Sequence, residues 1–267
     1  MTAFRETFGK SGQRLALFFV HIARMTHLVG RTFFWISIAP FRGKKLRWGA
    51  TFEQMVRIGV ESVPIVGIIS FSVGLIIAMQ AAYQLERFGA MIYVADLVSV
   101  SMCRELGPLI TAIIIAGRSG SAIAAEIGTM KVSEELDALQ TMALNPIGFL
   151  VAPRMLAMMV AIPCLTILAD FVGIAGGFTL ALTSLNLSFI AYFNETVAAL
   201  FAKDFITGLI KSFFFGIIIA QVGAYQGFNV QGGAEGVGKS TTASVVLSIF
   251  LVIMADLLFT MLFFSTF

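Results

Sequence analysis

Charged residues are scarce in this chain. Only 12% of its 267 residues are Asp, Glu, Lys or Arg, whereas 58% are hydrophobic. Soluble domains are typically about 25% charged and about 45–50% apolar. The shortage of charge therefore excludes an ordinary soluble domain and indicates an integral membrane protein.

Cysteine and histidine are also rare. The two cysteines, Cys103 and Cys164, lie within apolar runs, where neither a disulfide framework nor a metal-binding spacing is visible. The sequence also lacks the Ser-His-Asp, metal-ligand and paired-carboxylate arrangements on which hydrolases depend. We therefore expect no enzyme activity, no metal site and no cofactor in this chain.

Positive charge is concentrated near the N-terminus. Ten of the 18 Lys and Arg residues precede Ile58. Basic residues beside membrane spans mark the cytoplasmic side of a bilayer, so we expect a cytoplasmic N-terminus. Because these residues are interleaved with long apolar stretches, they do not form the basic patch of a nucleic-acid-binding domain.

The first helix is expected at residues 14–39, lying along the membrane surface. Its basic residues share one arc at about 100° per residue: Arg14, His21, Arg24, His27 and Arg31. Its apolar residues share a roughly opposed arc: Phe18, Ile22, Met25, Val29, Phe33 and Ile36. Separate faces of this kind are typical of an interfacial amphipathic helix. Pro40 should end it, and residues 42–57 should form a basic linker.

Five later segments are apolar over the roughly 20 residues that a helix needs to cross a bilayer. The expected spans are 58–83, 93–125, 149–182, 205–228 and 242–264. Between the third and fourth, the segment 186–203 indicates a loop with a short helix. The fold class is therefore an all-α integral membrane protein, with a single domain over residues 1–267 and a C-terminus on the periplasmic side.

Two adjacent charges, Arg104 and Glu105, interrupt the second expected span. Intramembrane charges are costly and usually face a bundle interior or a water-filled cavity. One interpretation is a polar contact on a translocation path, for example with a lipid headgroup. The other is a structural pair that neutralises itself or meets Lys211 or Asp256. A little further on, small residues four apart within 117–128 predict close helix packing.

Residues 131–142 (KVSEELDALQTM) suit a short helix. Ser133 can cap it, and Glu134 and Glu135 would favour its N-terminal dipole. Its apolar side would comprise Val132, Leu136, Leu139 and Met142. Because an exposed apolar side needs a partner, we favour a docking helix over a solvated loop helix.

Residues 233–240 (GAEGVGKS) match the phosphate-binding pattern G-x-x-x-x-G-K-[ST]. That pattern binds phosphate only between a strand and a helix of an α/β unit. Here it stands between two apolar spans. We interpret it as a coincidental glycine-rich turn with Lys239 near the membrane interface.

Residues 104–154 (RELGPLITAIIIAGRSGSAIAAEIGTMKVSEELDALQTMALNPIGFLVAPR) resemble the signature region of MlaE-type permeases, the membrane subunits of ABC transporters that work with MCE proteins. The later GGAEGVGKSTTASVV resembles that family's last loop and final helix, with Lys239 where the family more often has Arg. The resemblance covers nearly the whole chain from about residue 50.

The resemblance implies a homodimer in the bacterial inner membrane that moves glycerophospholipid between inner and outer membranes and so maintains outer-membrane lipid asymmetry. It implies MlaF-type ATPase subunits that bind ATP and Mg, an MlaB-type STAS-domain subunit, and a periplasmic MlaD-type MCE hexamer. The alternative is a stand-alone secondary transporter that uses Glu105, Lys211 and Asp256 as an ion relay. Inverted repeats would favour that alternative, and none is visible.

Two sets of site residues follow. The expected lipid site combines Arg104 and Glu105 with one mostly apolar face of the first span: Ile77, Ala81, Gln84, Leu85 and Phe88. In a homodimer two such faces would line a central cavity, unless the face packs on a neighbouring helix. The residues expected to couple to the ATPase are Val132, Glu134, Glu135, Leu136, Asp137, Leu139 and Met142.

Overall fold

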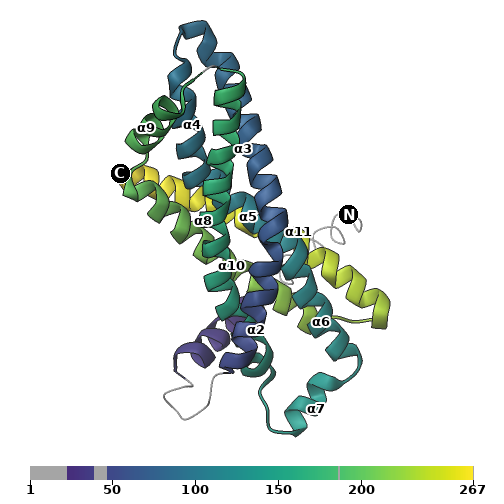
Figure 1. The fold of residues 1–267 in the computed structure, drawn as a ribbon. Coiled ribbons are helices and arrows are strands. Elements are labelled where there is room, and N and C mark those ends of the chain that lie inside the picture. Colours follow the sequence, from purple (N-terminus) through teal and green to yellow (C-terminus); the bar gives the residue numbers. More distant parts are fainter. Residues whose placement is uncertain (1–22, 39–46, 186, 267) are drawn as a thin grey trace, which may run out of the picture.

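The computed structural model describes residues 23–38, 47–185 and 187–266, and every regular element among them is a helix (Figure 1). Within these residues, five helical segments are long and apolar enough to cross a membrane: Trp48–Phe88, Met91–Val132, Ile147–Thr183, Ala202–Phe228 and Gly233–Phe263. The expected all-α membrane fold with five spans is therefore confirmed.

The first span is broken near its start. It consists of α2 (Trp48–Ile58), the 3₁₀ turn η2 (Val60–Ser62) and α3 (Val63–Leu85), followed by the 3₁₀ turn η3 (Glu86–Phe88). The expectation of a basic linker up to residue 57 was thus wrong from Trp48 onward. Within 48–57 Arg57 is the only basic residue, and it lies in the last turn of α2, where it complements the helix dipole.

The second span contains two π-helical turns. After η4 (Met91–Tyr93) it runs through α4 (Val94–Ser101), η5 (Met102–Leu106), α5 (Gly107–Ile115), η6 (Ala116–Gly120) and α6 (Ser121–Val132). It therefore ends at Val132, beyond the expected end at residue 125. Such π-turns are frequent at functional sites, and each of these two carries an arginine, Arg104 or Arg118.

The remaining chain supplies three spans and two short helices. These are α7 (Glu135–Thr141), η7 (Ile147–Val151), α8 (Ala152–Thr183), α9 (Phe189–Ala199), α10 (Ala202–Phe228) and α11 (Gly233–Thr266). Helix α9 lies in the segment 186–203, where a short helix was expected. The last span starts at Gly233 rather than near residue 242, so the glycine-rich segment is helical and not a turn.

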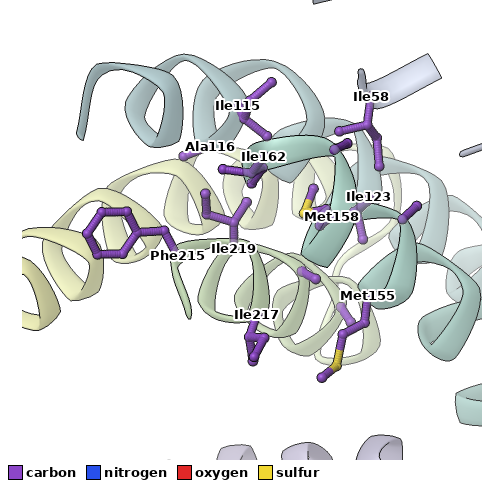
Figure 2. Packing of buried hydrophobic residues seen from close by; sticks show 14 of the residues in the cluster. Ile58, Ile115, Ala116, Ile123, Met155, Met158, Ile162, Phe215, Ile217 and Ile219 are labelled. Carbon is purple, nitrogen blue, oxygen red and sulfur yellow. The ribbon is translucent and has the colours of Figure 1, made fainter. Parts of the chain in front are cut away.

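Helix α8 forms the centre of the bundle and contacts α2, α3, α5 and α10. Its side chains meet those of α5, α6 and α10 in the main apolar core, where Met158 and Ile162 lie near Ile115 and Ile219 (Figure 2). Small residues allow the close approach of α3, since a Cβ atom on Gly74 would lie 1.9 Å from the carbonyl oxygen of Gly173.

Within 117–128, Gly120 and Gly128 pack closely as expected, whereas Gly117 is exposed and a Cβ atom there would meet nothing within 4 Å. A Cβ atom on Gly120 would lie 3.0 Å from Ile219 of α10, and one on Gly128 would lie 2.7 Å from Val230. The small face of α6 therefore contacts its neighbours directly. Sequence analysis missed the tighter α3–α8 contact, although Ser70, Gly74 and Ala78 of α3 have the same four-residue spacing.

Residues 23–37 form a helix, while 14–22 and 39 of the expected interfacial helix lie outside the described residues. Leu28 is buried, and Met25 and Ile36 pack against the main core. Part of the apolar arc, which an interfacial helix would turn toward lipid, therefore contacts the protein itself. In Figure 1 this helix and α7 lie at the same end of the molecule, opposite the junction of α3 and α4.

Candidate functional site

A cluster of charged residues lies inside the bundle. The Nζ atom of Lys211 is 2.6 Å from Glu105, 2.9 Å from Asp256 and 2.7 Å from the hydroxyl of Thr260. Thr260 in turn donates a hydrogen bond of 3.0 Å to Glu105. Of the two interpretations left open for Glu105, the structure shows the ion pair with Lys211. Spans two, four and five are joined at this point.

Arg104 points to a different partner. Its guanidinium lies 2.6 Å from Asp204, whose other carboxylate oxygen accepts a 2.9 Å hydrogen bond from the backbone N–H of Phe201. Asp204 therefore both caps the N-terminus of α10 and forms the ion pair with Arg104. Sequence analysis missed Asp204 because the residue fell between the expected loop 186–203 and the expected span 205–228. An acidic residue in the first turn of an apolar helix is the signal that could have found it.

A cavity of about 400 Å³ opens beside these ion pairs. It is lined by Arg104, Glu105, Lys203, Asp204, Thr207, Lys211, Thr260 and Phe263. The Lys211 side chain is almost fully buried, whereas that of Arg104 is 45% exposed and Lys203 is also exposed. The cavity therefore offers two accessible cations beside an apolar ring, an arrangement suited to a phosphate that carries acyl chains.

The expected lipid face of the first span divides into two parts. Ile77, Ala81 and Leu85 are partly buried and pack against the second apolar cluster of the same chain. Gln84 and Phe88 are exposed, and Phe88 belongs to the 3₁₀ turn η3 rather than to α3. None of these five residues lines the cavity at Arg104. Within one chain the structure does not bring the two halves of the expected lipid site together.

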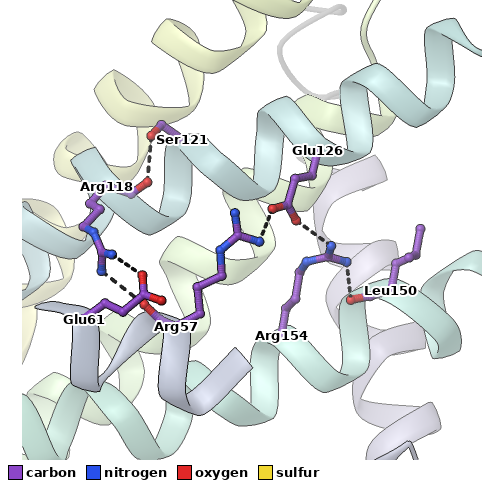
Figure 3. Close-up of polar contacts among 7 residues, drawn as sticks. All are labelled: Arg57, Glu61, Arg118, Ser121, Glu126, Leu150 and Arg154. Atoms are coloured by element: carbon purple, nitrogen blue, oxygen red, sulfur yellow. Dashed lines mark hydrogen bonds and ion pairs between the residues drawn. The ribbon is translucent and has the colours of Figure 1, made fainter. Parts of the chain in front are cut away.

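A second charged network ties the first three spans together near the α7 end (Figure 3). Arg118 of η6 binds Glu61 at 2.7 Å and donates a 2.6 Å hydrogen bond to Ser62, both in the break of the first span. Glu126 of α6 binds Arg57, and it also binds Arg154 of α8 at 2.7 Å. The network therefore holds the break between α2 and α3 against the π-turn η6.

The expected docking helix is shorter than 131–142. Val132 ends α6, Glu134 has a left-handed φ of 60°, and α7 begins only at Glu135. The hydroxyl of Ser133 bonds to Thr129 and Glu135 and does not cap the helix, which corrects that expectation.

Two of the four apolar residues expected on that helix contact the protein itself. Leu136 is only 3% exposed, and Leu139 packs against the main core. Val132 and Met142 are exposed, as are Glu135 and Asp137. The surface open to a partner is therefore mostly acidic, with Met142 as its principal apolar contact.

The segment that matches a nucleotide-binding pattern forms the first turns of α11. Lys239 pairs with Glu235 one helical turn earlier at 2.7 Å, and both side chains are exposed. A helical backbone cannot fold its amides around phosphates as a glycine-rich loop does. The geometry agrees with the interpretation of this match as a coincidence.

Five helical spans, ion pairs inside them and a short exposed helix at one end define a multi-pass membrane protein of the transporter class. A family model described as Permease MlaE matches residues 51–262. The chain belongs to the MlaE permease family, and the expected resemblance is confirmed.

Curated relatives support the same assignment. A probable ABC transporter permease protein of Rickettsia prowazekii is 37% identical over 257 residues, covering 91% of this chain and 99% of that protein. The intermembrane phospholipid transport system permease protein MlaE of Haemophilus influenzae is 33% identical over 216 residues, covering 80% of this chain and 82% of that protein. Protein TRIGALACTOSYLDIACYLGLYCEROL 1, chloroplastic, of Arabidopsis thaliana is 36% identical, covering 83% of this chain and 63% of that protein.

Proposed function

We propose that this chain is the membrane subunit of an ABC transporter that moves glycerophospholipids between the inner and outer membranes of a bacterium. Its work with an MCE protein would maintain the lipid asymmetry of the outer membrane. Membership of the MlaE family, with a relative named for intermembrane phospholipid transport, supports the proposal. The structural observation that carries it is the cavity at Arg104 and Lys203.

In this proposal the lipid phosphate binds between Arg104 and Lys203. Lys211 is unsuited to this role because it is almost fully buried and contacts both Glu105 and Asp256. Arg104 pairs with Asp204 too, but its side chain remains 45% exposed to the cavity. Phe263 offers an apolar surface for the first part of an acyl chain. The adjacent hydroxyl of Thr207 is bonded to the backbone of its own helix, so it shapes the wall without competing for the cations.

The partners expected from the sequence are part of the proposal. In the most apolar stretches of the first and last spans, only 28% and 11% of the residues are buried within one chain, which leaves surface for a second copy in a homodimer. The MlaF-type ATPase, which would bind ATP and Mg, would contact α7 on the cytoplasmic side and carry the MlaB-type STAS subunit. The MlaD-type MCE hexamer would contact the periplasmic end. With five crossings, the N-terminus would be cytoplasmic and the C-terminus periplasmic.

Reconstitution tests this function directly. The chain would be co-expressed with its ATPase and MCE partners, placed in proteoliposomes and assayed for transfer of a fluorescent phospholipid to acceptor vesicles. We expect transfer that requires ATP hydrolysis by the partner. Transfer by the chain alone, driven by a proton gradient, would instead support the ion relay through Glu105, Lys211 and Asp256 and overturn the proposal.

A further inference from the structure

A second, larger cavity lies at the α7 end of the molecule, away from the cavity at Arg104. It has a volume of about 990 Å³ and lies between the helix 23–37, the turn that joins α7 to η7, and the end of α10. Its polar and aromatic walls include Arg31, Trp35, Arg47, Gln140, Asn145 and Phe149. Among the described lining residues, none is shared with the cavity proposed for transport.

The described lining of this cavity carries positive charge and no negative charge. No Asp or Glu is among its described lining residues, and neither Arg31 nor Arg47 has an ion pair among the described residues. The guanidinium of Arg47 lies over the ring of Phe149, 3.8 Å from its centroid. Stacking uses the flat face of a guanidinium and leaves the N–H donors at its edge available to an anion.

The walls of the cavity are held in place by contacts that do not involve the N–H groups of Arg31 and Arg47. A Cβ atom on Gly148 would lie 2.5 Å from the ring of Trp35, so the indole lies directly on a residue that has no side chain. Asn145 accepts a 3.0 Å hydrogen bond from the backbone N–H of Ile147 and so fixes the turn after α7. The helix 23–37 is thereby attached to the start of the third span, with the cavity between them.

The positive surface continues along the same helix. A neighbouring cavity of about 480 Å³ contains Arg24 and His27, shares Phe228 with the first, and also has no acidic residue among its described lining. Tryptophan and long cationic side chains favour the headgroup level of a bilayer, where their apolar parts reach inward. Arg24 and Arg31 therefore lie along one helix with Trp35, a combination of side chains suited to the headgroup level of a bilayer.

We propose that the larger cavity binds an anionic glycerophospholipid from the surrounding leaflet. Arg31 and Arg47 would hold its phosphate, while Trp35, Phe149 and Phe228 would contact its acyl chains. A free phosphate ion shares the headgroup chemistry but cannot use the aromatic walls. Since Gln140 of α7 lines the same cavity, the bound lipid would also steady the helix proposed to contact the ATPase. The contact of α7 with the ATPase and the assignment of this leaflet to the cytoplasmic side rest on the proposed function.

The two tryptophans of the chain, Trp35 and Trp48, allow a direct test. Trp48→Phe leaves Trp35 as the only tryptophan, and its fluorescence would be followed in phosphatidylcholine vesicles that contain brominated phosphatidylglycerol or brominated phosphatidylcholine. We expect the anionic lipid to quench Trp35 at a several-fold lower mole fraction. In the matched Trp35→Phe variant, Trp48 should show no such preference.

Charge variants identify the binding groups. Arg31→Gln with Arg47→Gln should abolish the preference of Trp35 for the anionic lipid, and lysine at both positions should largely retain it. Arg31→Gln alone, at an exposed side chain with no ion pair among the described residues, should weaken it with the fold intact by circular dichroism. Arg87→Gln, in η3 at the opposite end, should have no effect.

Three outcomes would overturn the proposal. The first is equal quenching by the two brominated lipids. The second is a preference that survives in the double glutamine variant. The third is loss of the quenching when excess inorganic phosphate is added, since this would show a simple anion site. All three are independent of ATP hydrolysis and lipid transfer, so they leave the proposed transport function unaffected.

Discussion

The ammonium group of Lys211 in span four lies 2.6 Å from the carboxylate of Glu105 in span two, 106 residues away in the sequence. Asp256 of the last span contacts the same ammonium group at 2.9 Å. A lone charge at this depth would be expensive, because neither hydrocarbon nor protein replaces its hydration. The cluster therefore links spans two, four and five through charges that depend on one another.

Replacement of Lys211 by methionine should destabilise the chain strongly, because Glu105 and Asp256 would lose their shared cation. Removal of one member of a buried ion pair costs about 3–5 kcal/mol. We expect a lower Tm in detergent, and substantial recovery when Glu105→Gln and Asp256→Asn are added. Lys239→Met, at an exposed surface pair, is the control and should leave Tm unchanged. A Lys211→Met variant with the same Tm as the parent would contradict this stabilising role of Lys211.

The contact between α3 and α8 depends on the lack of a side chain at Gly74. In Gly74→Ala the new methyl group would lie 1.9 Å from the Gly173 carbonyl oxygen, so the two helices must separate. Overpacking of this kind costs about 1–3 kcal/mol. The matched control is Gly67→Ala on the same helix, where a Cβ atom would meet nothing within 4 Å. Thermal unfolding in detergent should separate the two variants, and equal stability would refute the prediction.

The number of spans followed from the sequence because each span is a long apolar run. The ends were less accurate, since hydropathy marks the hydrocarbon core and not the helix that continues beyond it. For this reason α2 was taken as a linker and the start of α11 at Gly233 was taken as a turn. Backbone hydrogen bonds remain favourable in the interface, so a helix need not stop where its apolar residues do.

The sites were harder to predict than the fold. The sequence shows that Arg104 and Glu105 need partners, but a partner such as Asp204, one hundred residues away, is set by how the helices pack. Amphipathic spacing correctly found an apolar side at Leu136 and Leu139. It could not show that the main core of the same chain covers that side, because periodicity identifies a buried face and not what buries it.

Helix α7 should bind the ATPase through its exposed residues. Glu135→Lys with Met142→Asp changes only exposed positions and should release a co-purified ATPase while the chain keeps its Tm. A Leu139→Asp variant is unsuitable, since Leu139 packs against the core and an aspartate there would also destabilise the fold. Glu235→Lys, the same charge reversal on α11, should retain the ATPase. Stoichiometric ATPase on the double variant would argue against docking through α7.

The nucleotide-like motif should have no function in nucleotide binding. Because residues 233–240 are helical and Lys239 already pairs with Glu235, we expect the isolated chain to bind no ATP in equilibrium dialysis. Lys239→Ala should leave nucleotide binding by the assembled transporter unchanged. Measurable ATP affinity in the isolated chain, lost in Lys239→Ala, would show that this interpretation is wrong.

The cavity at Arg104 should tolerate no bulky group if lipid passes through it. Thr207 lines the cavity, whereas the neighbouring Ile206 is exposed on the outer surface of α10. In Thr207→Trp the indole would occupy much of the cavity of about 400 Å³. Lipid transfer in proteoliposomes should therefore fall at least about tenfold, which corresponds to about 1.4 kcal/mol in activation free energy. Co-purification of the partners should be unchanged. The control Ile206→Trp adds the same ring one residue away and should transfer lipid normally. Equal transfer rates in the two variants, with the complex intact, would exclude this cavity from the lipid path.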